Sequence, residues 1–332
     1  MLKENHLRYP ITVWLFLCCL LVVAMILLGG ATRLTEAGLS IVEWKPLTGI
    51  IPPLSKEDWL NAFNHYKQFP EYKLKHMDLT LSDFKFIFYM EYSHRLLGRL
   101  LGIVFLLPFL FFWKAYKPAL KRRLVVLLCI GGLQGFAGWF MVKSGLVNNP
   151  YVSHYRLALH LSLAFILLFL MIEALFAINP TAIPLHRRIK IPSVFSLVAI
   201  CLTIIYGTFV AGLRAGKLYN TFPKMGDEWI PYEWLFYQPV YINFVENPAT
   251  VQWVHRLLAF FTAGISIWLI KRLKDAKHFM ELTLLLFAVA LQILLGIMTV
   301  LSIVLVPLAL LHQCGAIVLF TYVVVLYFRA RA

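Results

Sequence analysis

Eight long runs of apolar residues dominate the chain, and polar segments separate them. A helix needs about 20 residues to cross a hydrocarbon core about 30 Å thick, and each run is about that long or longer. Backbone N–H and C=O groups in lipid must be paired within the protein, so such runs fold as helices. We therefore predict eight transmembrane helices, over residues 11–30, 85–113, 124–142, 155–178, 192–213, 249–270, 279–301 and 306–328.

Composition supports this pattern. The 332 residues are 61% hydrophobic and only 14% charged, whereas soluble domains are about half apolar and about a quarter charged. A net charge of +15 would suggest nucleic acid as a partner of a soluble protein. Here the Lys and Arg residues gather in short loops beside apolar runs, as membrane topology requires. We predict an all-α integral membrane protein and no nucleic-acid partner.

The distribution of charge also predicts the orientation. The segments 114–123, 187–190 and 271–277 are rich in Lys and Arg and nearly free of acids, whereas acids slightly outnumber bases in the long loops 31–84 and 214–248. Basic loops stay in the cytoplasm. The long loops then face outward, and both termini are cytoplasmic. The first apolar run lacks a small-residue cleavage site, and no Arg- and Ser-rich transit segment precedes it, which favours a bacterial plasma (inner) membrane.

An internal repeat relates the two halves of the chain. The motif His94-Arg95-Leu96-Leu97 recurs as His255-Arg256-Leu257-Leu258, and Leu133-Gln134 with Gly138 recurs as Leu291-Gln292 with Gly296. Gly29 and Gly207 take matching places in the first helix of each half. Such offsets indicate a duplicated four-helix unit. An even number of helices gives both copies one orientation. We predict two pseudo-symmetric four-helix bundles, residues 1–178 and 192–332.

Four histidines lie at one predicted depth. His94, His160, His255 and His312 occupy the second, fourth, sixth and eighth helices, each within about three turns of the outer end. A single helical histidine is usually a satisfied core residue, but two in each repeat at one depth favour ligands. Zinc prefers four ligands, whereas heme iron accepts two axial nitrogens from facing helices. We predict a bis-histidine heme site in each half.

Charged side chains beside these histidines distinguish the halves. Glu91 stands one turn before His94, and Gln252, which cannot ionise, stands at the matching place before His255. We predict chemistry in the N-terminal half and a fixed cofactor in the C-terminal half. The alternative for Glu91 is a structural ion pair with Arg95 at i+4. Arg95 and Arg256 have two interpretations: they pair with heme propionates, or they extend to the membrane interface.

The chain resembles the heme A synthase family along nearly its whole length. The similarity is carried by Gly29-Gly30-Ala31-Thr32-Arg33, Gly38-Leu39-Ser40, Trp44-Lys45-Pro46, Pro52-Pro53, Pro70-Glu71-Tyr72, the segments 84–99 and 211–225, Val254-His255-Arg256 and His312-Gln313. The order and spacing of these stretches are specific. The first outer loop lacks the cysteine pair of some bacterial members and resembles the proteobacterial and mitochondrial branch instead.

The resemblance implies an oxidoreductase that converts the C8 methyl of heme O into the formyl group of heme A by successive hydroxylation. His94 and His160 would flank the substrate heme, and His255 and His312 would ligate a heme b cofactor. Glu91 would be the residue most needed for the chemistry. Heme O synthase and cytochrome oxidase assembly factors would be partners.

Two other functions compete with this one. A di-heme b-type electron-transfer membrane subunit is the nearest, but such proteins commonly carry two histidines on one helix. A transporter built from repeats would have broken helices with polar residues at mid-membrane, whereas the polar residues here cluster near the outer surface.

Local motifs make further predictions in the outer loops. Ser55 and Asp58 form a capping-box pattern that predicts a surface helix over 56–67, and Thr80 with Asp83 predicts the start of the second long helix. Asn247-Pro248 predicts the start of the sixth. We expect both outer loops to cover the heme sites. Spaced glycines predict close helix packing, at Gly98 with Gly102, Gly131 with Gly135, and Gly212 with Gly216.

Overall fold

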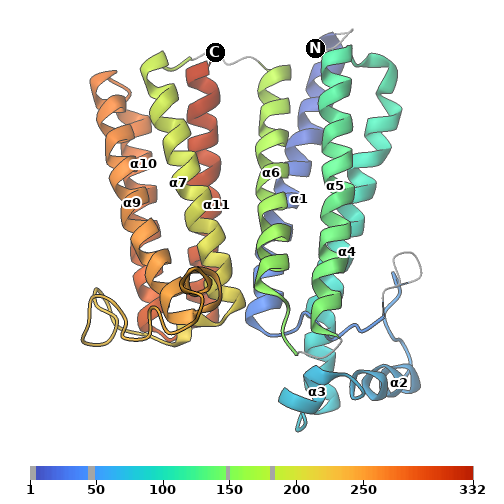
Figure 1. Cartoon of the computed structure of the whole chain (residues 1–332). Helices are drawn as coiled ribbons and strands as arrows, with labels where there is room; N and C mark the ends of the chain where they lie inside the picture. Colours follow the sequence, from blue (N-terminus) through green and yellow to red (C-terminus); the bar gives the residue numbers. More distant parts are fainter. Residues whose placement is uncertain (1–4, 44–48, 147–149, 180–183, 332) are drawn as a thin grey trace. The chain divides into compact units, whose positions relative to one another are not determined.

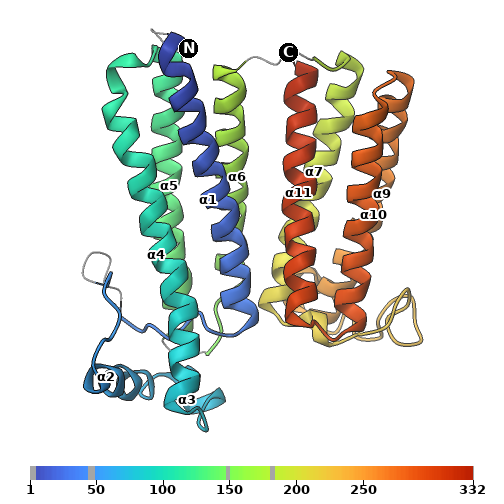
Figure 2. The ribbon, with the colours of Figure 1, turned by 180° about the vertical axis from the view of Figure 1, so that it is seen from behind.

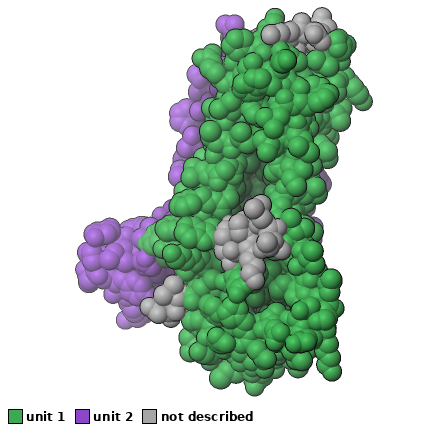
Figure 3. Space-filling view, turned by 90° about the vertical axis from the view of Figure 1, so that its right-hand side faces the viewer, with its two compact units in different colours: residues 1–167 green, residues 168–332 purple. Residues whose placement is uncertain are grey.

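The computed structural model describes residues 5–43, 49–146, 150–179 and 184–331. Trp44-Lys45-Pro46, one of the resembling stretches, lies outside these residues. Within them the structure contains helices and turns and no strand, which confirms the all-α class. The chain divides into two compact units, Met1–Leu167 and Leu168–Ala332 (Figure 3). The assignment of one heme site to each predicted half stays a prediction.

The first unit contains three complete long helices and the start of a fourth. They are α1 (Arg8–Leu34), α4 (Leu81–Phe111), α5 (Pro118–Gly145) and α6 (His154–Ile178), whose last residues belong to the second unit. The helices run side by side, and α1 packs closely on α4 (Figures 1 and 2). The short helices α2 (Lys56–Tyr66) and α3 (Pro70–Lys75) lie at the end of this bundle opposite the N-terminus (Figure 1).

The second unit contains the helices α7 (Lys190–Gly212), α9 (Pro248–Asp275), α10 (Phe279–Leu301) and α11 (Val306–Arg331). Helix α7 packs on α9 and α11, and α10 packs on the same two helices. The long connection between α7 and α9, with its short helix α8 (Asn243–Glu246), lies at the end of the unit opposite the C-terminus (Figure 1).

In the part of the chain that the structure describes, eight helices are long and apolar enough to cross a membrane, which confirms the predicted spans. The largest difference is at α5, predicted over 124–142 and observed from Pro118 to Gly145. The helix begins with a proline in its first turn and continues through the basic residues before the apolar run. Hydropathy detects only the part of a helix that lies in lipid, whereas a cap or proline sets its end.

The predicted helix starts are confirmed. Ser55 Oγ accepts the Asp58 N–H at 3.0 Å, and Asp58 accepts the Ser55 N–H at 3.0 Å, so α2 begins in a capping box. Thr80 and Asp83 form the same motif before α4. Asn247 caps α9, whose first residue is Pro248. Each motif satisfies N–H groups that have no partner within the helix.

A small aromatic core ties α2 to the extended start of α4. Trp59, Phe63 and Tyr66 of α2 are buried against Phe84 and Phe88 of α4. The Phe63 and Phe84 rings are stacked with centroids 5.0 Å apart. The first turns of α4 therefore hold the outer loop, and the same helix carries the candidate site residues about two turns further on.

Candidate functional site

The histidine pair of the first unit is formed by α4 and α6. His94 lies on α4 and His160 on α6, and both belong to the first unit. The His160 ring packs against Gly138 of α5. The two histidines that the repeat predicts as partners therefore lie on two helices of one unit, and their pairing stays a prediction.

The second unit repeats this arrangement with His255 of α9 and His312 of α11. His255 Nδ1 lies 3.1 Å from the Thr203 carbonyl oxygen. A carbonyl only accepts, so Nδ1 carries the proton and Nε2 keeps a free lone pair. His312 Nδ1 lies 3.2 Å from Gln292 Nε2, which also donates to the His312 carbonyl at 3.1 Å.

At His255 this arrangement fits the ligation of heme iron, because Nε2 keeps a free lone pair. At His312 the Gln292 amide nitrogen faces Nδ1, so the same tautomer there requires the amide to be turned over. A metal-binding histidine normally directs its second ring nitrogen at a backbone carbonyl or another fixed acceptor, which sets the tautomer. His255 has that anchor in Thr203. Partner rings on facing helices of one bundle are the usual source of such axial ligands.

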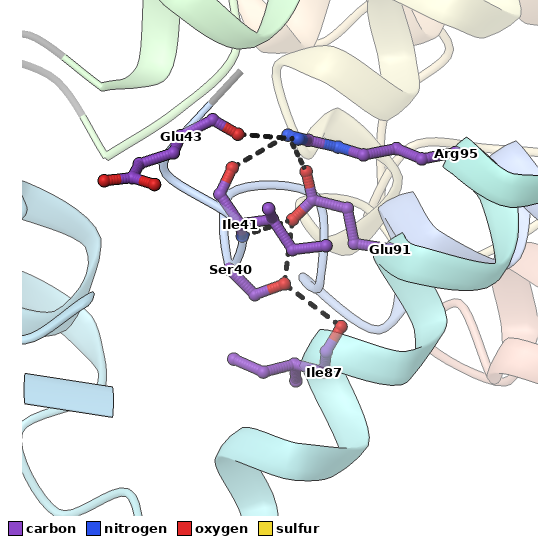
Figure 4. Close-up of polar contacts among 6 residues, drawn as sticks. All are labelled: Ser40, Ile41, Glu43, Ile87, Glu91 and Arg95. Carbon is purple, nitrogen blue, oxygen red and sulfur yellow. Dashed lines mark hydrogen bonds and ion pairs between the residues drawn. The ribbon is translucent and has the colours of Figure 1, made fainter. Parts of the chain in front are cut away.

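Glu91 is buried, with 3% of its surface exposed, and both carboxylate oxygens have partners (Figure 4). Oε2 accepts from Ser40 Oγ and from the Ile41 N–H, each at 2.8 Å. Oε1 lies 2.6 Å from an Arg95 nitrogen. The ion pair that is the alternative interpretation of Glu91 is therefore present, and the carboxylate also holds the segment that follows α1.

Arg95 binds the same segment through its carbonyl groups. It donates to Ile41 O at 2.8 Å and to Glu43 O at 3.1 Å (Figure 4). Sequence reasoning missed this contact. The sequence gives no signal for it, because the contact uses backbone carbonyl groups and so leaves no residue preference at position 41.

The second unit contains the equivalent contact. Arg256 donates to Tyr219 O at 3.0 Å and to Thr221 O at 2.9 Å. Gln252 Nε2 donates to Tyr219 O at 2.9 Å. In both units the arginine after the histidine holds the backbone beyond the first long helix. Its proposed pairing with a heme propionate stays a prediction.

A cavity of about 210 Å³ opens beside Arg95. Trp139, Val142 and Lys143 of α5 form one side, and Ile41 and Val42 form another. Lys143 lies over the Trp139 ring, 5.1 Å from its centroid. Two cationic side chains at an otherwise apolar cavity suit an anionic group on an apolar ligand.

A second polar cluster, which the sequence reasoning missed, lies in the outer loop. Tyr66 OH donates to Glu71 Oε2 at 3.1 Å, and its oxygen lies 2.8 Å from His76 Nδ1. Lys75 Nζ lies 2.6 Å from Glu36 Oε2. Burial raises the pKa of Glu71 to about 7, which Lys75 and Tyr66 oppose only in part. Its one signal in the sequence was Pro70-Glu71-Tyr72 among the resembling stretches.

These features define a class: a multi-pass α-helical membrane protein whose two compact units each carry two histidines on different long helices. The chain matches the model of the cytochrome oxidase assembly protein family, COX15-CtaA, over residues 12–324. It belongs to that family.

Curated relatives agree over nearly the whole length. The heme A synthase of Nitrosospira multiformis is 47% identical over 331 residues, which cover 96% of this chain and 93% of the relative. The heme A synthase of Rhodospirillum centenum is 45% identical over 318 residues, covering 93% of this chain and 85% of the relative. That of Wolbachia pipientis wMel is 44% identical, covering 94% and 90%. The predicted resemblance is confirmed.

Proposed function

We propose that the protein is a heme A synthase, an oxidoreductase that converts the C8 methyl of heme O into the formyl group of heme A. The observation that carries this proposal is the pair of histidines on two long helices of each unit, each ring packed against a glycine, in a chain whose relatives have that name. The substrate binds between His94 and His160, and heme b binds between His255 and His312.

The surroundings of His94 support its assignment to the substrate. In heme O the C8 methyl and a propionate belong to the same pyrrole ring, so a group that acts on the methyl lies near one that binds the propionate. Glu91 and Arg95 are such neighbours, 2.6 Å apart. The cavity beside Arg95, with Lys143 at its side, would receive the propionate. Glu91 would accept a proton as the methyl is oxidised.

The C-terminal site lacks this capacity. Gln252 is buried and donates its amide to a backbone carbonyl, and it has no carboxylate that could accept a proton. When bound, heme b supplies one-electron redox chemistry to that site. His255, held by Thr203, and His312 would fix its orientation.

The location follows from the topology. We propose a bacterial plasma (inner) membrane, with both termini in the cytoplasm and the connections 35–80 and 213–247 outside, where they cover the two heme sites. Within each unit the long connection lies at the end opposite the chain terminus, which supports this orientation (Figure 1). Heme O synthase and cytochrome oxidase assembly factors are the proposed partners.

The test is pigment analysis of membranes that contain the chain together with a source of heme O. We expect heme A to accumulate, and we expect Glu91→Gln to keep the heme b spectrum while turnover falls by about 10²–10⁴, the usual contribution of a general base. Ser40→Ala is the matched comparison, because it removes one hydrogen bond from the same carboxylate oxygen and leaves the charge.

Each result has a defined meaning. Absence of a bis-histidine heme b signal would exclude both heme-binding functions. Heme without oxidised products would favour the electron-transfer subunit. An equal loss in Ser40→Ala and Glu91→Gln would assign Glu91 to anchoring the loop. Loss of heme b with retained turnover in Glu91→Gln would reverse the assignment of the two sites.

A further inference from the structure

Each of the four histidines lies directly against a glycine of a neighbouring helix. A Cβ atom added to Gly138 would lie 3.0 Å from His160 Cε1, and one added to Gly207 would lie 3.1 Å from His255 Cε1. The corresponding distance from Gly296 to His312 Cε1 is 2.9 Å, and from Gly29 to His94 Nε2 it is 3.0 Å. Separations this short require the ring to move.

Not every glycine of the long helices meets a neighbour this closely. Among the described residues, nothing lies within 4 Å of a Cβ added at Gly102 on α4, Gly135 on α5 or Gly264 on α9. A few other glycines do have a close contact, but with side chains other than histidine. The repeat also pairs the four glycines, Gly29 with Gly207 and Gly138 with Gly296. A glycine beside each histidine has therefore been kept in both copies of the unit.

The backbone beside these glycines explains the arrangement. The Thr203 carbonyl that accepts from His255 Nδ1 belongs to the residue four before Gly207. Gln134 and Gln292 stand four residues before Gly138 and Gly296, and their backbones lie near His160 and His312. In a helix the carbonyl of residue i−4 faces residue i. A side chain at residue i would separate the ring from that carbonyl.

We propose that Gly29, Gly138, Gly207 and Gly296 are positioning residues that hold the four imidazoles for ligation. Each glycine admits its ring to the face of the adjacent helix. At His255 the ring then meets the backbone one turn earlier, at the Thr203 carbonyl, which sets the orientation of Nε2. This inference rests on the proposed heme ligation.

His94 differs from the other three rings. It directs Nε2 and Cδ2 at Gly29, whereas the others direct Cε1 and Nδ1 at their glycines. A methyl group at Gly29 would therefore press on a ring nitrogen, whereas at the other three sites it would press first on Cε1. The substrate site is therefore the more sensitive of the two to this substitution.

The experiment compares Gly→Ala variants of the full-length protein in purified form. Gly207→Ala and Gly296→Ala test the heme b site, and Gly264→Ala on α9 is the control. Gly138→Ala tests the heme O site, and Gly135→Ala on the same helix is its control. The measurements are the low-spin heme signals in optical and electron paramagnetic resonance spectra, the midpoint potential of heme b, and the affinity for added heme O.

We expect Gly207→Ala and Gly296→Ala to shift the low-spin signal and the potential of heme b, with retention weakened about tenfold or more, as for other groups that orient metal ligands. Gly138→Ala and Gly29→Ala should each weaken heme O binding about tenfold or more and leave the heme b spectrum unchanged. We expect the larger loss of heme O affinity in Gly29→Ala. The controls should match the wild type.

The outcomes separate the inference from the proposed function. If His255→Ala keeps the heme b signal, heme ligation itself is wrong. If His255→Ala loses that signal while Gly207→Ala matches Gly264→Ala in every spectrum, ligation holds and the positioning role is wrong. A Gly207→Ala variant that only lowers the unfolding temperature, with unchanged resonance positions and potential, also overturns the inference.

Discussion

At the scale of single residues, the position one turn before the histidine is a hydrogen-bond acceptor in the first unit and a donor in the second. Glu91 accepts the Ile41 N–H, whereas Gln252 donates to the Tyr219 carbonyl. Both side chains bind the segment beyond the first long helix of their unit, so holding that segment does not require a carboxylate. The presence of a carboxylate in the N-terminal unit alone is therefore a reason to seek a chemical role for Glu91.

Glu71 gives a pH dependence at this scale. Its folded-state pKa of about 7 lies above the usual 4.5 because of burial. Between pH 4.5 and about pH 7, Glu71 in the folded protein therefore keeps a proton that it has already lost in the unfolded chain. The contribution of Glu71 to the free energy of unfolding is fully present below about pH 4.5. It falls as the pH rises and is lost above about pH 7, a change of at most about 3 kcal/mol.

Hydrogen exchange of the α2 and α3 amides, corrected for intrinsic rates, measures this change. We expect protection to decrease from pH 5 to pH 7.5 and the slope to flatten in Glu71→Gln, which keeps an acceptor for Tyr66. His76, the other titratable contact of Tyr66, is present in both proteins. If protection falls with pH equally steeply in the wild type and in Glu71→Gln, Glu71 is not the cause of the pH dependence.

At the scale of elements, the caps and the arginine contacts determine how the outer segments are held. Capping boxes start α2 and α4, and Arg95 and Arg256 hold the segments that leave α1 and α7. The caps depend on neighbours in sequence, so the sequence predicts them. The arginine contacts join residues more than thirty positions apart, so they depend on how the loop folds back.

The cap of α2 provides a test at this scale. We expect Ser55→Ala to destabilise the helix by about 1 kcal/mol, because the Asp58 N–H loses its acceptor. Exchange should accelerate in the first turn of α2 and little elsewhere. Thr283→Ala is a suitable control, since this exposed threonine bonds a carbonyl within α10 and caps nothing. An equal effect of both changes would contradict the assignment.

Glycines show the limit of pattern reasoning about elements. The prediction of close packing is wrong for Gly102, Gly131 and Gly135, beside which the described residues leave open space. Close contacts occur instead at the four glycines beside the histidines and at a few others, such as Gly145 against Leu39 and Gly216 against Val304. A small-residue spacing shows that a close approach is possible, but only the packing of the helices shows whether a neighbour makes it.

At the scale of the whole molecule, the duplication organises both the membrane topology and the candidate sites. Two units in one orientation would put both histidine pairs on the outer side of the membrane, below the two long connections. The orientation is a prediction from the distribution of Lys and Arg.

Single-cysteine labelling in intact cells tests the topology. We expect Glu57→Cys and Asp227→Cys to react with a membrane-impermeant maleimide, and Lys117→Cys to react only after permeabilisation. The native cysteines lie within long helices, and a variant without them provides the background. Reaction of Lys117→Cys in sealed cells would invert the proposed topology.

The spans, the helix starts, the predicted duplication and the four histidines can all be read from the sequence alone. These follow from hydropathy, from caps within one turn, and from comparison of the chain with itself, and none requires a distant contact. Which groups contact one another is seen only in the folded chain: Arg95 with Ile41, each histidine with its glycine, and Glu71 with Tyr66. Burial and hydrogen bonding between separated segments depend on the packing of several helices together, which no local pattern specifies.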